Sequence, residues 1–246
     1  DLASYEDAKA RIWEGIASPL DAVANLGDPV VAARVPAGAT GFGTPDAACR
    51  IESGLLLLDG SPVVEVAALP RSMPHDLENA QAACAVAVRS GATVEACADS
   101  LRGFGGLEHR MSFVAEVDGV RYVDDSKATT PHAALTALSG LPGAVLIAGG
   151  RNKGLDLTRL ADGRPGAVVA IGEAADAVAA AFDGRCPVVV ASSMEEAVRA
   201  ARRSAAGTGT VLLSPGCSSF DWYGSYADRG RDFQRIVRSL AGTGEA

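Results

Sequence analysis

The segment AVLIAGGRNKG, residues 144–154, contains the pattern that decides the fold. A strand-sized apolar run is followed directly by two glycines and a polar turn. Four similar runs occur between residues 120 and 213, separated by Ala-rich stretches of about a dozen residues. Strands that alternate with helices at this spacing are typical of βαβ units. The sequence therefore predicts an α/β unit with a doubly wound, mostly parallel sheet, with strands at residues 120–123, 144–148, 167–171, 188–191 and 210–213.

The first hundred residues show a different pattern of short strands and helices. Expected strands cover residues 22–25, 39–42, 49–52, 55–58 and 63–66, and expected helices cover residues 5–15, 75–90 and 93–101. The Asp59-Gly60 pair predicts a hairpin turn between the last two strands. The glycine-rich segment 103–106 suits a link between separately folding units. We therefore expect one domain over residues 1–104 and a second over residues 105–246.

Composition excludes several classes of function. The chain has 246 residues and a formal net charge of -8, which argues against non-specific binding of nucleic acid or of an anionic membrane surface. Its apolar runs are too short to span a bilayer. The five cysteines show no C-x-x-C spacing and favour reduced thiols in a cytoplasm. The chain begins at Asp1 and not at Met, in a stretch typical of a helix interior, so we expect a longer polypeptide with a further N-terminal part.

Ligands bind at the carboxyl ends of the strands in an open parallel sheet, so the loops after the predicted strands are the candidate site. Three of these loops are rich in charged residues, hydroxyl groups or glycine: DDSKATTP (124–131), GGRNKG (149–154) and SPGCSSFD (214–221). The chain has only three lysines, and two of them, Lys127 and Lys153, lie in these loops. A lysine kept in an arginine-rich chain indicates a position that needs a compact amine; chance is the alternative.

The loop after residue 123 leads into a predicted helix whose N-terminus attracts an anion, and Lys127 and Thr129 add to that attraction. The Asp125 carboxylate suits a ribose hydroxyl or a cation, whereas the alternative is that Asp125 and Thr129 only cap the helix. In the second loop, Lys153 supplies a positive charge or is a solvated surface residue. We interpret Cys217 as a buried small residue and not a nucleophile, because no histidine is near it in sequence.

Two further segments, outside these loops, contain candidate binding residues. Residues 75–79 (HDLEN) open a predicted helix, and residues 106–110 (GLEHR) follow the glycine-rich link. Arg110 is placed to clamp a phosphate when two domains close. Neither a G-x-G-x-x-G fingerprint nor a G-x-x-x-x-G-K-[ST] loop occurs in the chain.

Together these motifs resemble the Mur ligase family of peptidoglycan synthesis. The match rests on YEDAKARI (5–12), HDLEN, GLEHR, DDSKAT (124–129), GGRNKG, LSPGCSSFD (213–221) and Arg229-Gly230, in the family's order. The DDSKAT and LSPxxxSFD stretches are most similar to the branch that adds D-glutamate. The resemblance implies a Rossmann-like, amino-acid-binding C-terminal domain, preceded by the C-terminal part of an α/β ATPase central domain.

The activity implied by this resemblance is an ATP- and Mg²⁺-dependent amide ligation in a monomeric cytoplasmic enzyme. ATP would phosphorylate the carboxylate of UDP-MurNAc-L-alanine, and the amine of D-glutamate would attack the acyl phosphate. The P-loop would lie upstream of Asp1, so this segment alone would be inactive. The alternatives are a ligase for a different amino acid, a nucleotide-binding module of an oxidoreductase, and a non-catalytic scaffold.

The resemblance also implies roles for individual residues. Lys9 would be carbamylated and would bind Mg²⁺; His75 and Asn79 would contact the nucleotide, Asn79 at the adenine; Arg110 and Asp125 would contact ribose and phosphates; Lys127 would lie near the reacting centre; and Thr129, Lys153, Ser219 and Tyr226 would hold D-glutamate. The chain departs from the family's usual residues at Asp76, Thr130 and Tyr226, where Asn, Asn and Phe are common.

Overall fold

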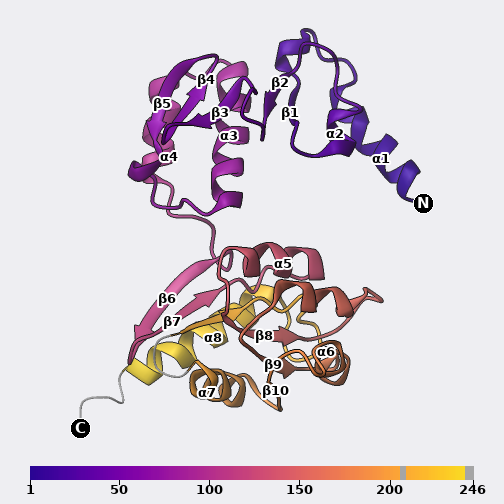
Figure 1. Cartoon of the computed structure of the whole chain (residues 1–246), viewed down its shortest axis with the longest axis vertical. Coiled ribbons are helices and arrows are strands. Elements are labelled where there is room, and N and C mark those ends of the chain that lie inside the picture. The colour runs from indigo at the N-terminus through magenta and orange to yellow at the C-terminus, as the bar shows by residue number, and fades with distance from the viewer. Residues whose placement is uncertain (206–208, 242–246) are drawn as a thin grey trace. The chain divides into compact units, whose positions relative to one another are not determined.

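The computed structural model describes residues 1–205 and 209–241. It divides into two compact units, Asp1–Gly105 and Gly106–Ala246 (Figure 1). No described helix is both long enough and apolar enough to cross a membrane.

The first unit contains a five-stranded sheet in the order β1-β2-β3-β4-β5. The strands are β1 (Val23–Asn25), β2 (Thr40–Phe42), β3 (Cys49–Glu52), β4 (Leu55–Leu58) and β5 (Ser61–Glu65). The first three are parallel, and β4 is antiparallel to both of its neighbours. Asp59 and Gly60 both have positive φ angles, 50° and 79°, as a tight hairpin turn requires. The predicted strands and the hairpin are thereby confirmed, with shifts of one or two residues at the ends.

Helices complete the first unit. They are α1 (Leu2–Ala10), α2 (Pro29–Ala32), α3 (Pro74–Arg89) and α4 (Val94–Gly103). The helix expected over residues 5–15 starts earlier and ends in a separate 3₁₀ turn, Arg11–Trp13. Buried side chains of α3 and α4, including Cys84 and Cys97, pack with Leu56 of β4 in one apolar core.

The second unit is built on a six-stranded sheet in the order β10-β9-β8-β11-β7-β6. Its strands are β6 (Ser112–Val117), β7 (Val120–Asp124), β8 (Val145–Gly149), β9 (Ala167–Ile171), β10 (Val188–Ala191) and β11 (Thr210–Leu213). Five strands are parallel and match the predicted ones to within a residue. The sixth, β6, is antiparallel to β7 and was not predicted. The α/β, mostly parallel fold is confirmed.

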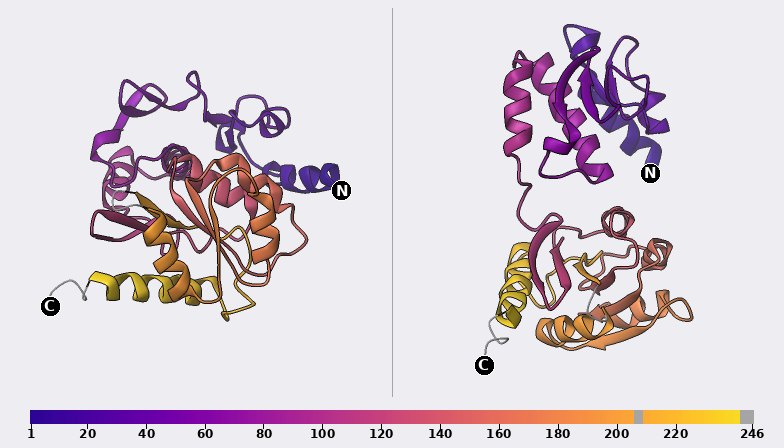
Figure 2. Two further views of the ribbon diagram at one scale, coloured as in Figure 1. Left: turned by 60° about the horizontal axis from the view of Figure 1, so that its bottom comes forward. Right: turned by 60° about the vertical axis from the view of Figure 1, so that its left-hand side comes forward.

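Helices cover both faces of this second sheet (Figures 1 and 2). One face packs against α7 (Met194–Ser204) and α8 (Tyr226–Ala241), and the other packs against α5 (Pro131–Ser139), α6 (Ala175–Ala181) and the 3₁₀ helix η4 (Leu157–Gly163). Every residue of β8 and β9 is therefore buried, as in strands of a parallel sheet enclosed on two sides.

The local signals for helix starts are largely confirmed. Thr130 caps α5, with Pro131 in the first turn. Ser193 caps α7 by accepting a hydrogen bond from the N–H of Glu196. The second half of the expected capping box differs, because the Glu196 carboxylate accepts from the N–H and the hydroxyl of Ser192, one residue earlier.

The strand order positions the candidate site. Because β11 lies between β8 and β7 and all three strands are parallel, their carboxyl ends meet at one edge of the sheet. The loops after β7, β8 and β11 therefore leave the sheet side by side. Gly149 makes the β8 turn possible: its φ is +124°, and a Cβ there would lie 2.0 Å from the Ile171 carbonyl oxygen.

Candidate functional site

A buried hydrogen-bonded network begins at Asp124, the last residue of β7. Its Oδ2 lies 2.6 Å from His109 Nδ1 and 2.7 Å from Gln234 Nε2, and its Oδ1 accepts from the N–H of Ser126 at 2.9 Å. Asp124 and His109 are 0% and 3% exposed. The His109 carbonyl also accepts from the N–H of Lys127. The network therefore fixes the first residues of the loop after β7.

A buried arginine connects this loop to the loop after β11. Arg229, on α8, is 1% exposed. Its Nε donates to Ser126 Oγ at 3.0 Å, and its Nη2 donates to the Ser126 carbonyl at 2.9 Å and to the Cys217 carbonyl at 3.1 Å. Burial lowers the pKa of Arg229 to about 10, so the guanidinium remains charged at neutral pH.

The second carboxylate of the pair, Asp125, is almost completely enclosed. Its Oδ1 accepts from the N–H of Met111 at 3.2 Å, and its Oδ2 accepts from Ser214 Oγ at 2.8 Å. Burial is the main reason why the pKa of Asp125 rises to about 6, although the hydrogen bonds from Ser214 and Met111 oppose the rise. Asp125 joins the segment before β6 to the loops after β7 and β11. It does not cap α5, because the N-cap of that helix is Thr130.

Lys127 and Tyr226 form a pair at the edge of the network. Lys127 Nζ lies 5.7 Å from the centroid of the Tyr226 ring, within the range of a cation–π interaction. Two other residues hold Tyr226. The His109 ring contacts the Tyr226 ring edge-on, with 6.4 Å between the ring centroids, and the Ser126 hydroxyl donates to the Tyr226 carbonyl. Thr129 is half-buried in the same loop.

The loop after β8 is held by its own hydrogen bonds and by the β11 loop. Arg151 and Ser218 exchange two backbone hydrogen bonds, at 2.9 and 3.1 Å. Asn152 closes a turn by bonding both the N–H and the carbonyl of Leu155. Lys153 lies within that turn and is exposed. The backbone of this loop is therefore ordered, while the Lys153 amine is accessible to a ligand.

Residues 214–219 of the β11 loop are all buried. Ser219 is 2% exposed and Cys217 is 1% exposed. The interpretation of Cys217 as a buried small residue is confirmed; burial raises the pKa of its thiol to about 11. The expected contact of Ser219 with an amino acid stays a prediction, because its side chain presents almost no surface.

Arg110 is exposed just before β6. It lies between His109 and Met111, which both have positive φ angles, 59° and 49°. Such angles are uncommon for residues other than glycine and concentrate at functional sites. Within the described residues the Arg110 guanidinium has no hydrogen-bond or ion-pair partner, so it is available to an anion.

The remaining expected residues belong to the first unit. Lys9 is exposed on α1, with its Nζ 5.4 Å from the centroid of the Tyr5 ring. His75 and Asn79 lie one turn apart on α3 and thus on one face of it. His75 Nε2 lies 3.6 Å from the Asp76 carboxylate, which also pairs with Arg71. Each position is a prediction that rests on the resemblance.

A metal site is not evident from the donor groups. Across residues 1–205 and 209–241, no group of three or more His, Cys, Asp or Glu side chains could hold a metal ion. The described residues thus offer no site built wholly from protein donors, whereas Mg²⁺ that binds together with nucleotide phosphates needs only one or two protein ligands.

Three residues organise the site: His109, Asp124 and Arg229. The sequence motifs contained all three, but sequence reasoning assigned no role to any of them. A signal for Arg229 was present. Phe233, Ile236 and Val237 form the buried stripe of α8, and Arg229 occupies the same helical face one turn before Phe233. A charged residue on an apolar stripe must find buried partners.

The raised pKa of Asp125 determines how stability changes with pH. Its ordinary value of 3.8 rises to about 6 in the folded chain, so the stabilising contribution of the protonated acid is complete below about pH 4 and is lost as pH rises through about 6. Asp125→Asn removes this titration. Relative to that variant, the unfolding free energy of the wild type should fall by up to about 3 kcal/mol between about pH 4 and pH 7.

Urea denaturation at both pH values measures this difference. A difference between the two proteins that does not change with pH, or that changes in the opposite direction, would contradict the assignment.

Sequence comparison identifies the second unit. Residues 109–217 match the family model described as "Mur ligase, glutamate ligase domain". The UDP-N-acetylmuramoylalanine–D-glutamate ligase of Methylococcus capsulatus is 42% identical over 254 residues, covering 98% of this chain and 55% of the relative. The enzyme of the same name from Syntrophotalea carbinolica is 38% identical, covering 99% and 57%. The chain thus spans about half the length of these curated relatives.

Solved structures share the fold. A pseudomurein peptide ligase type C from Methanothermus fervidus aligns with a TM-score of 0.73 and 14% identity, over 98% of this chain and 60% of its own. UDP-N-acetylmuramate-alanine ligase from Thermotoga maritima aligns with a TM-score of 0.69 and 16% identity, over 97% and 56%. Residues 109–217 therefore belong to the Mur ligase family, and similarity to ligases of that family extends over 98–99% of this chain.

Proposed function

We propose that this chain is part of an ATP-dependent ligase that joins D-glutamate to UDP-MurNAc-L-alanine during peptidoglycan synthesis in the cytoplasm. In this proposal residues 1–104 belong to the ATP-binding central domain, residues 105–246 form the amino-acid-binding domain, and the enzyme is monomeric. A relative named for that reaction is 42% identical across 98% of the chain.

The observation that carries the proposal is the convergence of three loops at the carboxyl edge of the second sheet. Hydrogen bonds from Arg229 join the loops after β7 and β11, and the Arg151–Ser218 pairing adds the loop after β8. The resulting edge presents ammonium groups from Lys127 and Lys153 on ordered backbone. Fixed cations in such an arrangement suit a substrate that carries carboxylates and an acyl phosphate.

The residues near β6 fit the ribose and phosphates of a nucleotide. The exposed Arg110 has a planar fork of donors suited to phosphate oxygens. Asp125 has both oxygens engaged by Met111 and Ser214 and is almost completely enclosed, so its assignment to the ribose rests on the family resemblance. His75 and Asn79 are assigned to the nucleotide as part of the same proposal. ATP supplies the phosphoryl group, and Lys9 as a carbamate ligand of Mg²⁺ rests on the family resemblance.

Amino-acid binding is assigned to the β7, β8 and β11 loops. Lys153 attracts a carboxylate of D-glutamate, and Thr129 offers a hydroxyl group. Ser219 is buried, and its assignment to D-glutamate rests on the family resemblance. The ring of Tyr226 positions the Lys127 ammonium, which stabilises negative charge as the amine attacks the acyl phosphate. The Lys127–Tyr226 geometry supports this division of roles, since it places a cation on a rigid aromatic face.

The reaction itself tests the proposal. The full-length protein that carries this sequence should release ADP from ATP only when UDP-MurNAc-L-alanine and D-glutamate are both present, because the acyl phosphate is formed on one substrate and consumed by the other. Mass spectrometry should find the amide product. Omission of either substrate is the control. ADP release supported by L-lysine or meso-diaminopimelate in place of D-glutamate would instead indicate a ligase for another amino acid.

Substitutions at Lys127 and Tyr226 test the assigned roles. In the full-length enzyme, Lys127→Ala should lower kcat by about 100-fold, because it removes a cation at the developing charge. Tyr226→Phe keeps the ring below Lys127 and should leave kcat within about twofold, whereas Tyr226→Ala should lower it about tenfold. Steady-state kinetics at saturating substrates gives the values. Equal losses in Tyr226→Phe and Tyr226→Ala would assign the role to the hydroxyl and overturn the account.

A further inference from the structure

A cavity of about 500 Å³ lies in the second unit, away from the three loops of the candidate site. Two segments line it. The end of η4 and the turn before β9 contribute Ala161, Asp162, Arg164 and Pro165, and the turn between α6 and β10 contributes Phe182, Arg185 and Cys186. The two segments meet where the Val168 N–H donates to the Pro187 carbonyl. The cavity is thus at the amino ends of β9 and β10, the sheet edge opposite to the one that carries Lys127 and Lys153.

Part of the cavity wall is apolar, although polar atoms make up the larger share of its exposed lining. Phe182 is 1% exposed and Ala161 is 4% exposed, and Pro165 beside them is also buried. A cavity of this size lies within the range of small-molecule sites, which combine an apolar lining with a few polar groups. This part of the wall therefore suits an apolar or planar part of a ligand.

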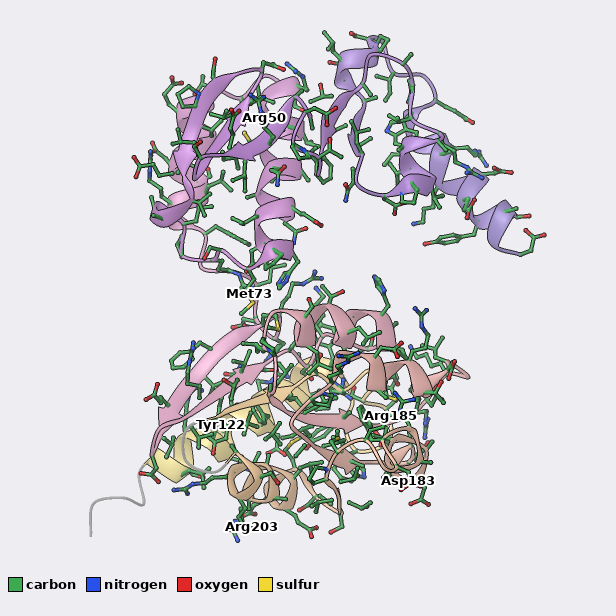
Figure 3. All side chains as sticks on the ribbon, in the orientation of Figure 1. Arg50, Met73, Tyr122, Asp183, Arg185 and Arg203 are labelled. Carbon is green, nitrogen blue, oxygen red and sulfur yellow. The ribbon has the colours of Figure 1, made fainter. Side chains whose placement is uncertain are left out.

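Two arginines supply the polar groups. Arg164 has a left-handed backbone, with φ +46°, and the N–H of Arg185 donates to the Phe182 carbonyl at 3.0 Å in a tight turn. Figure 3 shows Arg185 beside α6. Neither guanidinium has an ion-pair or hydrogen-bond partner in the part of the chain that the structure describes, whereas the exposed Arg151 pairs with Glu173.

One acidic residue, Asp162, also lines the cavity. Its carboxylate forms no ion pair with Arg164 or Arg185 in the structure, and it leaves the cavity with a net positive charge. An anion would be attracted by the two guanidinium groups and repelled by Asp162. Substitution of either arginine should therefore weaken anion binding, and substitution of Asp162 should strengthen it.

We propose that this cavity is a binding site for a small organic phosphate. The phosphate lies between the guanidinium groups of Arg164 and Arg185, whose forked donors match its oxygens. The organic part packs on the apolar atoms of the cavity wall beside Phe182, Ala161 and Pro165. The site is separate from the proposed ligase chemistry, and its failure would leave that proposal unaffected.

Cys186 provides a reporter in the native chain. It lines the cavity and is the one partly exposed cysteine of five, all of which the structure describes. Phenyl phosphate is the probe, because it joins a dianion to an apolar ring. We expect millimolar phenyl phosphate to slow the alkylation of Cys186 by N-ethylmaleimide in a saturable way, followed by mass spectrometry at about pH 8, where more of the thiol is ionised.

Compounds that carry only the ring or only the phosphate, and variants that lack a charged residue of the cavity, show which contacts contribute to binding. Phenol and inorganic phosphate should each need about tenfold higher concentrations, since each lacks half of the contacts. The Arg164→Ala/Arg185→Ala double variant should weaken protection by at least about tenfold. Asp162→Asn should strengthen protection severalfold, because it removes the repelling carboxylate.

The matched control is Arg199→Ala/Arg203→Ala, which removes the same charge from α7, where Arg203 lies far from Arg185 in Figure 3. This control should keep wild-type protection. An unchanged thermal unfolding midpoint in each variant shows that the fold is retained. Equal protection of the cavity double variant and the wild type, or equal protection by phenol and phenyl phosphate, would overturn the proposal.

Discussion

The second unit depends on the placement of one buried cation. The Arg229 guanidinium sits behind the carboxyl edge of the sheet and donates to two loops, at Ser126 and at the Cys217 carbonyl. Its hydrogen-bond partners are neutral oxygens, and no carboxylate is among them. Burial lowers the pKa of the guanidinium to about 10, which still leaves it charged at neutral pH. Loss of this group would leave buried carbonyls unpaired, and each unpaired group costs about 1–3 kcal/mol.

The geometry of the candidate site follows from that arrangement. Ser126 accepts from Arg229 and donates to the Tyr226 carbonyl, which couples the β7 loop to the start of α8. Asp124 holds the same loop from the other side through His109 and Gln234. Lys127 is consequently supported by backbone that is bonded on both sides. The side chains that would meet substrate, Lys127, Lys153 and Arg110, are partly or fully exposed, whereas the groups that hold them are buried.

The sequence was sufficient to predict the layout of the fold and the sheet edge that carries the candidate loops, since both follow from local patterns. Parallel strands are apolar runs, and ligand loops follow their carboxyl ends. It was not sufficient for the supporting network, because Arg229 and Ser126 are 103 residues apart, and nothing local to either residue specifies the other. The edge strand β6 was not predicted. It is followed by a tight turn in which Asp118 and Gly119 have positive φ angles. Only one of its side chains is buried, so its sequence lacks a clear alternation of apolar and polar residues.

The central claim is that Arg229 holds the β7 and β11 loops in one rigid edge. Arg229→Lys tests it directly, because a single ammonium cannot reproduce the forked contacts with Ser126 and Cys217. Amide hydrogen exchange of the variant, compared with the wild type, is the measurement. We expect exchange in residues 125–128 and 216–219 to be at least about tenfold faster, while β8 and β9 remain unchanged. Wild-type exchange in both loops would contradict the account.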